Sequence, residues 1–291
     1  MTVVAGLSLI GPATTGATVD AAGPVLWQFG RSEYRSAVRR GRFRPGIVHE
    51  SPLINGRATV VFIHGGGGAP GQFAHLAGAL RQRANLAAFL YDDTAHLAPA
   101  SCCLRQGLLA LPAPIILVAY SIGALLPAYA GASDPQGQLR GLTAVYVNPL
   151  IGGSCYADAD RLLLLLGDVP GLRWLHRVKR VIQRALLPAV VQDLAPEGDF
   201  QQAIFGASSL ASSFASGTVM LFTERPGEEP DIREDRVVKF FGRSRRELIE
   251  RMGAVAPVSP AQRNGHAAPL ADPELVLPLI ATALEGVPPE G

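Results

Sequence analysis

The strongest constraint on the fold of this 291-residue chain is a series of short apolar runs that alternate with helical patterns. The runs TVVFI at 59–63 and IILVA at 115–119 are rich in β-branched residues and show no polar–apolar alternation. Runs of this kind are typical of parallel strands buried on both faces. Further predicted strands lie at 87–91, 142–147, 218–222 and 254–258. We therefore predict an α/β fold with a mostly parallel central sheet and helices on both faces.

The segments between these strands carry apolar residues at helical spacing. Phe73, Leu76 and Leu80 follow this spacing after the first strand. The main predicted helices are 73–84, 101–111 and 273–284. Residues 1–54 carry no motif, and we expect them to supply leading antiparallel strands, for instance at 25–29.

The composition argues against several classes of function. The chain has 26 basic and 24 acidic residues, a net charge of +2, so it lacks the excess positive charge that general nucleic-acid binding requires. Its three cysteines, two of them adjacent at 102 and 103, form neither a disulfide framework nor a zinc-binding pattern. No apolar stretch is long enough for a transmembrane helix, which needs about 18 residues or more. We expect no nucleic-acid partner and no metal, and the oligomeric state stays open.

The first 22 residues are small and apolar, but no Lys or Arg precedes Arg31. A secretory signal has a basic start before its apolar core. We therefore predict a cytoplasmic protein.

About 70 residues of a different character separate the predicted strands 142–147 and 218–222. They contain a leucine run at 162–166 and an apolar helical stripe beside several arginines between 172 and 184. One interpretation is a pair of core-facing helices with a solvated basic face, and the other is an apolar lid above the carboxyl edge of the sheet. The predicted domains are a core of 1–150 and 216–291 and a helical cap or lid of 151–215.

The strongest functional motif is AYSIGA at 119–124, which directly follows an apolar strand and precedes a helical pattern. A serine at a sharp turn between strand and helix is the context of a catalytic nucleophile. Ala119 and Gly123 stand two residues before and after Ser121, where small side chains let the two backbones approach. The alternative is that Ser121 only caps the following helix.

A glycine-rich loop, HGGGG at 64–68, follows the predicted strand 59–63. Glycines let backbone N–H groups approach a ligand oxygen, as the oxyanion hole of an acyl-transfer enzyme requires. A phosphate loop is disfavoured because no Gly-Lys-Ser/Thr sequence follows. A dinucleotide site needs an acidic residue about 20 positions on, which Asp92 and Asp93 match poorly. A flexible turn is the remaining alternative.

His266, within NGHAAPL at 264–270, is the third candidate. It follows the predicted strand 254–258 and precedes the last helix, whereas the other five histidines lie in the glycine-rich loop, in helical patterns or beside strands. Serine, acid and histidine in this chain order are characteristic of one hydrolase fold.

These three motifs make the chain resemble an α/β-hydrolase of the serine esterase and lipase type, over residues 55–286. The order of strands and the position of the insertion match as well. The resemblance implies an acyl-enzyme mechanism that needs no metal or organic cofactor. The implied site residues are Ser121 as nucleophile, His266 as general base, and the backbone amides of Gly65 or Gly66 and of Ile122 as oxyanion hole.

The resemblance places the catalytic acid after the strand 218–222, where several carboxylates follow. Family members commonly carry a Val or Ile three residues after the acid. Asp235 with Val238 meets this pattern and stands 31 residues before the histidine, and Glu229 with Ile232 also meets it. We prefer Asp235 because aspartate is the more frequent acid. The other candidates are Glu224, Glu228, Glu229 and Asp231.

The implied function is hydrolysis of carboxylic esters with a hydrophobic acyl or alcohol part, from a small-molecule or lipid-like substrate. A thioesterase or acyltransferase would use the same residues. Other chemistries of the fold are a cofactor-free haloperoxidase and a carbon–carbon bond hydrolase. A catalytically silent protein that binds a ligand or a partner is the alternative outside enzymes.

Overall fold

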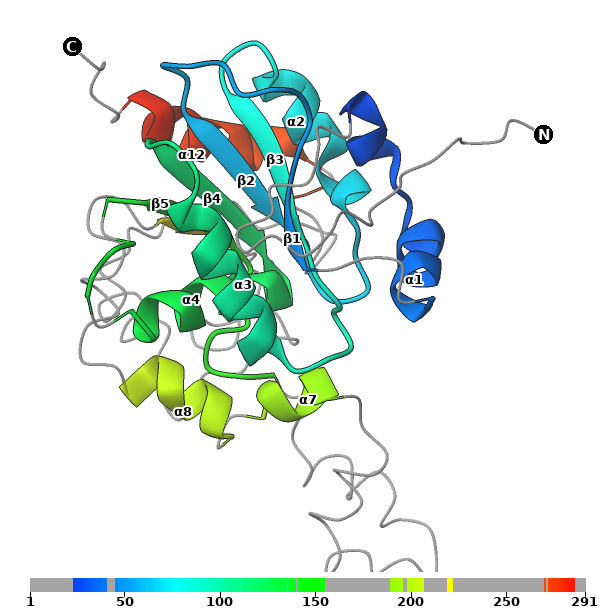
Figure 1. The fold of residues 1–291 in the computed structure, drawn as a ribbon, viewed down its shortest axis with the longest axis vertical. Coiled ribbons are helices and arrows are strands. Elements are labelled where there is room, and N and C mark those ends of the chain that lie inside the picture. The colour runs from blue at the N-terminus through cyan, green and yellow to red at the C-terminus, as the bar shows by residue number, and fades with distance from the viewer. Residues whose placement is uncertain are drawn as a thin grey trace, which may run out of the picture.

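A computed structural model describes residues 23–40, 45–134, 136–139, 141–154, 189–195, 198–206, 219–221, 270 and 272–285. Within these residues, six strands form one sheet in the order β1-β3-β2-β4-β5-β6 (Figure 1). The strands are β1 (Gly46–His49), β2 (Thr59–Ile63), β3 (Asn85–Leu90), β4 (Ile115–Tyr120), β5 (Thr143–Val147) and β6 (Val219–Leu221). Only β1 is antiparallel to its neighbour, β3. The predicted mostly parallel α/β sheet is confirmed.

Strands β2 and β4 lie at the centre of the sheet and pair in parallel from Thr59 opposite Ile115 to Ile63 opposite Ala119. Every residue of both strands is buried. A strand covered on both faces gains nothing from polar positions, which explains why these two runs are continuously apolar.

Helices cover both faces of the sheet (Figure 1). Val61 and Ile63 belong to one hydrophobic core, with α3 and α4. Val60 and Phe62 belong to the hydrophobic core of the other face, here called the second core, with η1, α2 and α12. The described helices are η1 (Gly23–Gln28), α1 (Arg31–Arg39), η2 (Pro70–Phe73), α2 (Ala74–Leu80), α3 (Leu97–Leu109), η3 (Ser121–Ala124), α4 (Leu125–Ala132), α7 (Ala189–Asp193), α8 (Asp199–Gly206) and α12 (Pro273–Glu285), where η marks a 3-10 helix.

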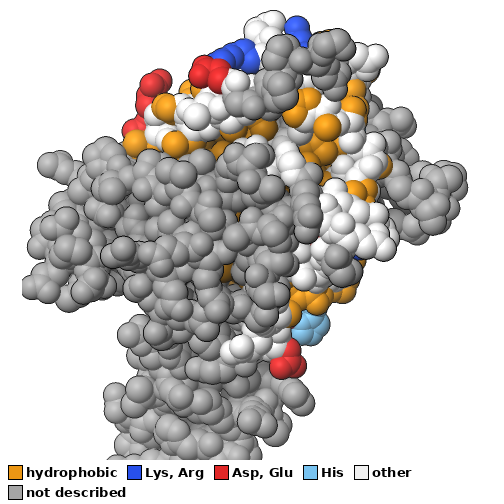
Figure 2. Space-filling model, turned by 90° about the vertical axis from the view of Figure 1, so that its left-hand side faces the viewer, with side chains coloured by type: hydrophobic (Ala, Val, Ile, Leu, Met, Phe, Trp, Pro, Cys, Tyr) orange, Lys and Arg blue, Asp and Glu red, His pale blue; other side chains and the backbone are white. Residues whose placement is uncertain are grey.

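Helix α12 closes the second core near the end of the chain. Val276 and Ile280 are fully buried, while Leu275, Leu277 and Leu279 pack against the same core and stay partly exposed. Viewed from the left-hand side of Figure 1, apolar side chains are visible across the upper part of the described surface (Figure 2). Within the described ranges, none of the helices has the length and apolarity to span a bilayer.

The predicted strand at 25–29 is wrong. The residues Gly23–Gln28 form the 3-10 helix η1, and its Leu26 and Trp27 are buried in the second core. The antiparallel strand expected from the first 54 residues is β1 instead. A short apolar segment does not distinguish one helical turn from a short strand, because both bury neighbouring side chains.

Several predicted boundaries also shift. The helix predicted at 101–111 runs from Leu97 to Leu109, and the helix predicted at 73–84 is η2 followed by α2. The predicted strand 218–222 is found as β6, whereas the predicted strand 254–258 lies outside the described residues.

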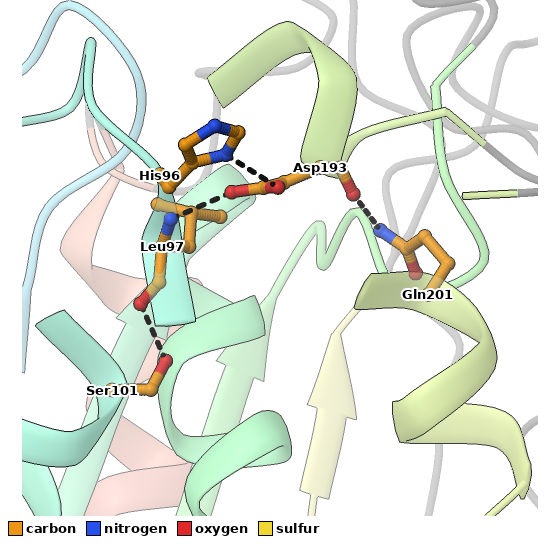
Figure 3. Close-up of polar contacts among 5 residues, drawn as sticks. All are labelled: His96, Leu97, Ser101, Asp193 and Gln201. Atoms are coloured by element: carbon orange, nitrogen blue, oxygen red, sulfur yellow. Dashed lines mark hydrogen bonds and ion pairs between the residues drawn. The ribbon is translucent and has the colours of Figure 1, made fainter. Parts of the chain in front are cut away.

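The early start of α3 has a cause that is remote in sequence (Figure 3). Oδ2 of Asp193, at the end of α7, accepts the backbone N–H of Leu97 at 2.6 Å, and its Oδ1 lies 3.1 Å from Nδ1 of His96. The carboxylate therefore caps the positive end of α3 in place of a local side chain. Gln201 of α8 donates to the carbonyl of Asp193 at 3.1 Å and accepts the N–H of Gly152 at 3.0 Å.

An aromatic pair also joins α8 to the core. Tyr129 of α4 stacks on Phe200 with ring centroids 4.5 Å apart and planes 4° from parallel. Helices α7 and α8 lie within the predicted cap. Both helices pack beside α3 and α4 of the core (Figure 1). Because most of 151–215 lies outside the described residues, the boundary of the cap stays a prediction.

We expect Asp193→Ala to lower the free energy of unfolding by about 1–3 kcal/mol, because it removes the cap of α3 and leaves a buried N–H unpaired. Urea unfolding measures this loss. The matched variant His96→Ala removes only the more exposed partner of the same carboxylate and should cost less than about 1 kcal/mol. Equal losses in the two variants would contradict the capping role of Asp193.

Candidate functional site

Ser121 stands directly after β4, where the strand turns into η3. Its φ angle is +55°, a left-handed conformation that residues other than glycine rarely adopt. The side chain is largely buried, at 7% exposure. Such backbone conformations persist only where the surrounding structure imposes them, and they cluster at functional sites. Ser121 therefore occupies a strained strand-to-helix turn.

Two glycines bring the glycine-rich loop against this turn. A Cβ atom on Gly123 would overlap the carbonyl oxygen of His64 and lie 2.8 Å from that of Ile63. A Cβ atom on Gly65 would lie 3.0 Å from Cβ of Ser121. No side chain fits at either position without movement of its neighbours. The two motifs that are far apart in the sequence are thus in direct contact.

The amides of the glycine-rich loop fall into two groups. The Gly67 N–H donates to the carboxylate of Asp93, and the Gly68 N–H donates to the carbonyl of Gly65 at 3.0 Å. The N–H groups of Gly65 and Gly66 have no hydrogen-bond partner among the described residues. Unpaired N–H groups are rare in the interior of a protein, and Gly65 is buried, whereas Gly66 is exposed, where solvent or a ligand can reach it. These two amides can therefore bind an oxygen atom beside the serine.

The carboxyl ends of three parallel strands meet at this point. Ile122, after β4, is buried, and a Cβ atom on Gly66, after β2, would lie 3.5 Å from its Cγ2. Leu150, after β5, donates its N–H to the carbonyl of Ser121 at 3.3 Å. Ligand sites of open α/β sheets lie at this edge.

Three buried aromatic side chains meet at the start of the glycine-rich loop: that of His64, its first residue, and those of Tyr34 and Tyr91, which sequence analysis did not assign to the site. Burial lowers the pKa of His64, an effect that the hydrogen bond to the Gly65 backbone and the charge of Asp93 oppose in part. Burial raises the pKa of both Tyr34 and Tyr91; the charge of Asp93 adds to this effect, and at Tyr34 the hydrogen bond with the backbone of Tyr91 opposes it in part. All three are therefore uncharged near neutral pH. The sequence contained one signal for this cluster: Tyr91 stands at the end of the predicted strand 87–91, directly before two aspartates.

The predicted partners of Ser121 lie outside the described residues. These are His266, Asp235, Glu224, Glu228, Glu229 and Asp231. Strand β6 runs parallel to β5, so the chain leaves β6 at the same edge of the sheet where β4 ends at the serine turn. The segment that carries the acid candidates therefore starts from that edge.

Two arginines of α1 approach the glycine-rich loop. A Cβ atom on Gly67, whose φ is +66°, would lie 2.5 Å from Nη2 of Arg31 and 3.0 Å from Nη2 of Arg35. Neither guanidinium belongs to an ion pair among the described residues. Helix α1 thus places two cationic groups beside the loop that no carboxylate among the described residues neutralises.

The described residues hold no group of three or more His, Cys, Asp and Glu side chains that could bind a metal ion. Cys102 and Cys103 lie on α3 as free thiols.

The model of the α/β hydrolase family matches residues 60–279, which include the glycine-rich loop, the serine turn and the predicted histidine. No curated protein matches the sequence.

Solved structures share the fold at low sequence identity. A hydrolase from Oleispira antarctica superposes with a TM-score of 0.53 at 14% identity, over 89% of this chain and 98% of that chain. A lipase from Bacillus licheniformis in its mature form gives 0.53 at 14% identity, over 82% and 97%. A haloalkane dehalogenase variant from Bradyrhizobium elkanii gives 0.51 at 15% identity, over 84% and 97%. At this identity the similarity concerns the fold alone.

We expect Gly123→Ala to lower the free energy of unfolding by about 1–3 kcal/mol, because the added methyl group meets backbone carbonyls at the end of a central strand. Thermal or urea unfolding measures the change. Gly78→Ala is the matched control, since a Cβ atom there meets nothing within 4 Å. Alanine favours an α-helix more than glycine by about 1 kcal/mol, so this control should be neutral or stabilised. Similar stability of both variants would show that the close approach at Gly123 is not a constraint.

Proposed function

Because the chain belongs to the α/β hydrolase family, we propose that it is a serine hydrolase that cleaves carboxylic esters with a hydrophobic acyl or alcohol part. One observation supports this most. Ser121 stands in a left-handed turn against a loop whose Gly65 and Gly66 amides have no partner within the described residues. A hydroxyl nucleophile beside free N–H donors is the arrangement that attack on a carbonyl group requires.

The proposed reaction proceeds through an acyl-enzyme. His266 accepts the hydroxyl proton of Ser121 as the oxygen attacks the ester carbonyl, and it then gives this proton to the leaving alcohol. Asp235 orients the imidazole and stabilises its cation. Water, deprotonated by the same histidine, then attacks the acyl-enzyme, and the histidine returns this proton to the oxygen of Ser121 as the carboxylic acid is released.

The oxyanion that forms at each attack is assigned to backbone donors. The N–H of Ile122 and that of Gly65 or Gly66 would bind it. Losing one such donor lowers turnover by about 10²–10³-fold in serine hydrolases, so donors held in place before the reaction supply much of the rate.

A hydrophobic substrate is supported by the residues next to the serine. Ile122, Leu150 and Ile151 are buried apolar residues, and the expected cap at 151–215 is rich in leucine. A measured preference for short, charged acids would contradict this part of the proposal.

We expect Ser121→Ala to lower hydrolysis of a p-nitrophenyl ester by at least about 10³-fold and to abolish covalent labelling by a fluorophosphonate probe. Ser101→Ala is the control, since Ser101 is a buried serine whose hydroxyl donates within α3, to Leu97 at 3.0 Å. The Ser101→Ala variant should keep both the ester hydrolysis and the covalent labelling of the wild type. Labelling that persists in Ser121→Ala would exclude this serine as the nucleophile, and an unlabelled wild-type protein would favour a silent binding protein.

The same assay distinguishes the acid candidates. Asp235→Asn should lower kcat by about 10³–10⁴-fold, as expected for loss of the residue that orients the base. Glu229→Gln should leave kcat within about threefold of the wild type. The reverse result would move the acid to Glu229.

The two arginines favour a second candidate, hydrolysis or transfer of acyl groups from a thioester whose carrier bears phosphate. Arg31 and Arg35 place guanidinium groups at Gly67 of the glycine-rich loop, and neither has an ion-pair partner within the described ranges. Guanidinium groups bind phosphate by paired, charge-assisted hydrogen bonds. A neutral ester would not use them.

If thioesters are the substrates, the double variant Arg31→Gln/Arg35→Gln should raise the KM for an acyl-CoA by at least about tenfold, because each charge-assisted hydrogen bond contributes about 1.5–3 kcal/mol. The KM for a p-nitrophenyl ester of the same acyl chain should not change. Arg83→Gln, which removes an exposed arginine elsewhere, is the control. Equal effects on both substrates, or a wild-type preference for the oxygen ester, would reject this candidate.

A further inference from the structure

Helix α1 precedes the residues matched by the family model, yet it contacts the glycine-rich loop. Its Tyr34 is buried at 2% exposure and reaches the first residue of this loop. We propose that Tyr34 is a positioning residue that holds the glycine-rich loop in the conformation required for oxyanion binding. The inference rests on the proposed function, which gives that loop its role.

The Tyr34 hydroxyl meets three polar groups at once. It donates to the carbonyl of Tyr91 at 2.6 Å, accepts the N–H of Tyr91 at 2.8 Å, and lies 3.0 Å from Nε2 of His64. The pairing of β3 with β1 ends at Leu90. One hydroxyl therefore joins the residue after β3 to the residue after β2.

The hydrogen bonds of His64 show why this hydroxyl matters. Nδ1 of His64 lies 2.9 Å from the carbonyl oxygen of Gly65, which can only accept, so Nδ1 carries the proton. Since burial lowers the pKa of His64, the ring is neutral and Nε2 has no proton. The hydroxyl of Tyr34 is the one donor that reaches Nε2 among the described residues. The hydroxyl has one proton, so at any moment Tyr34 donates either to Nε2 of His64 or to the carbonyl of Tyr91, and both acceptors depend on this single donor.

Tyr91 holds the backbone of the same histidine from the other side. Its hydroxyl donates to the carbonyl of His64 at 2.7 Å, and its ring stacks on the imidazole with centroids 4.5 Å apart. Further along the loop, Asp93 accepts the N–H of Gly67. The loop is held before and after the amides of Gly65 and Gly66, which have no partner in the described part of the chain.

This arrangement predicts an effect on rate more than on substrate binding. Without the Tyr34 hydroxyl, Nε2 of His64 loses its donor, and the imidazole that binds the Gly65 carbonyl is free to rotate. The adjoining amides must point at a charge that develops only in the transition state, so their displacement lowers kcat while KM changes little.

The test compares Tyr34→Phe with Tyr146→Phe. Tyr146 is a fully buried tyrosine of β5 whose hydroxyl has no hydrogen-bond partner in the described part of the chain, so the same atom is removed from a site without this role. For a p-nitrophenyl ester, Tyr34→Phe should lower kcat by about tenfold or more, with KM within about twofold. Amide hydrogen exchange at Gly67 and Gly68, whose N–H groups are hydrogen-bonded, should become faster in Tyr34→Phe. Tyr146→Phe should change neither measurement.

Each outcome decides the proposal. Unchanged kcat and unchanged exchange in Tyr34→Phe would overturn it and leave the hydrolase assignment intact. Parallel changes of kcat and KM would indicate a general structural role instead. If the wild-type protein shows no Ser121-dependent hydrolysis, the proposed function fails, and the exchange measurement alone still shows whether Tyr34 holds the loop.

If Tyr34→Phe does not fold, Tyr91→Phe removes the hydrogen bond to the His64 carbonyl and should lower kcat in the same way.

Discussion

The geometry of the site depends on one close contact between two backbones. Strands β2 and β4 pair in parallel, so the loops that follow them occupy the same edge of the sheet. The turn after β4 approaches the carbonyls at the end of β2 to a distance that only glycine at 123 allows. Ser121 lies inside this turn with φ +55°, and Gly65 leaves the loop side of the contact without a side chain. The hydroxyl and the unpaired amides are neighbours because of this steric condition.

The loop itself is held by polar contacts rather than by apolar packing. His64, Tyr34 and Tyr91 are buried at the end of the sheet, uncharged, and joined by hydrogen bonds of 2.6–3.0 Å. Burying polar groups is unfavourable unless each one finds a partner, so such a network adopts few alternative arrangements. The two apolar cores hold the strands, and the network then sets the direction of the peptide groups that follow β2. The amides of Gly65 and Gly66, left without a partner in the described residues, fit a loop prepared for a ligand oxygen.

Sequence reasoning succeeded where a residue's role depends on its immediate neighbours. The central strands at 59–63 and 115–119 could be predicted because a strand that is buried on both faces is apolar throughout. Reasoning failed where a distant residue decides the local structure. Helix α3 begins at Leu97 because Asp193 caps it, and the apolar segment predicted as a strand at 25–29 lies in the 3-10 helix η1 up to Gln28. Tyr34 carries no local signal at all, because its role comes from contact with Tyr91 and His64.

The sequence by itself determined the mostly parallel sheet, the serine between a strand and a helix, and the glycines that permit close backbone contact. These features follow from apolar periodicity and from the space that a side chain needs, both of which are local properties. Only the tertiary structure decided which loops meet, which amides remain unpaired, and which aromatic residues hold them. Hydrogen bonds and close contacts between remote segments depend on ångström-scale placement, which comes from the packing of the whole sheet and its helices.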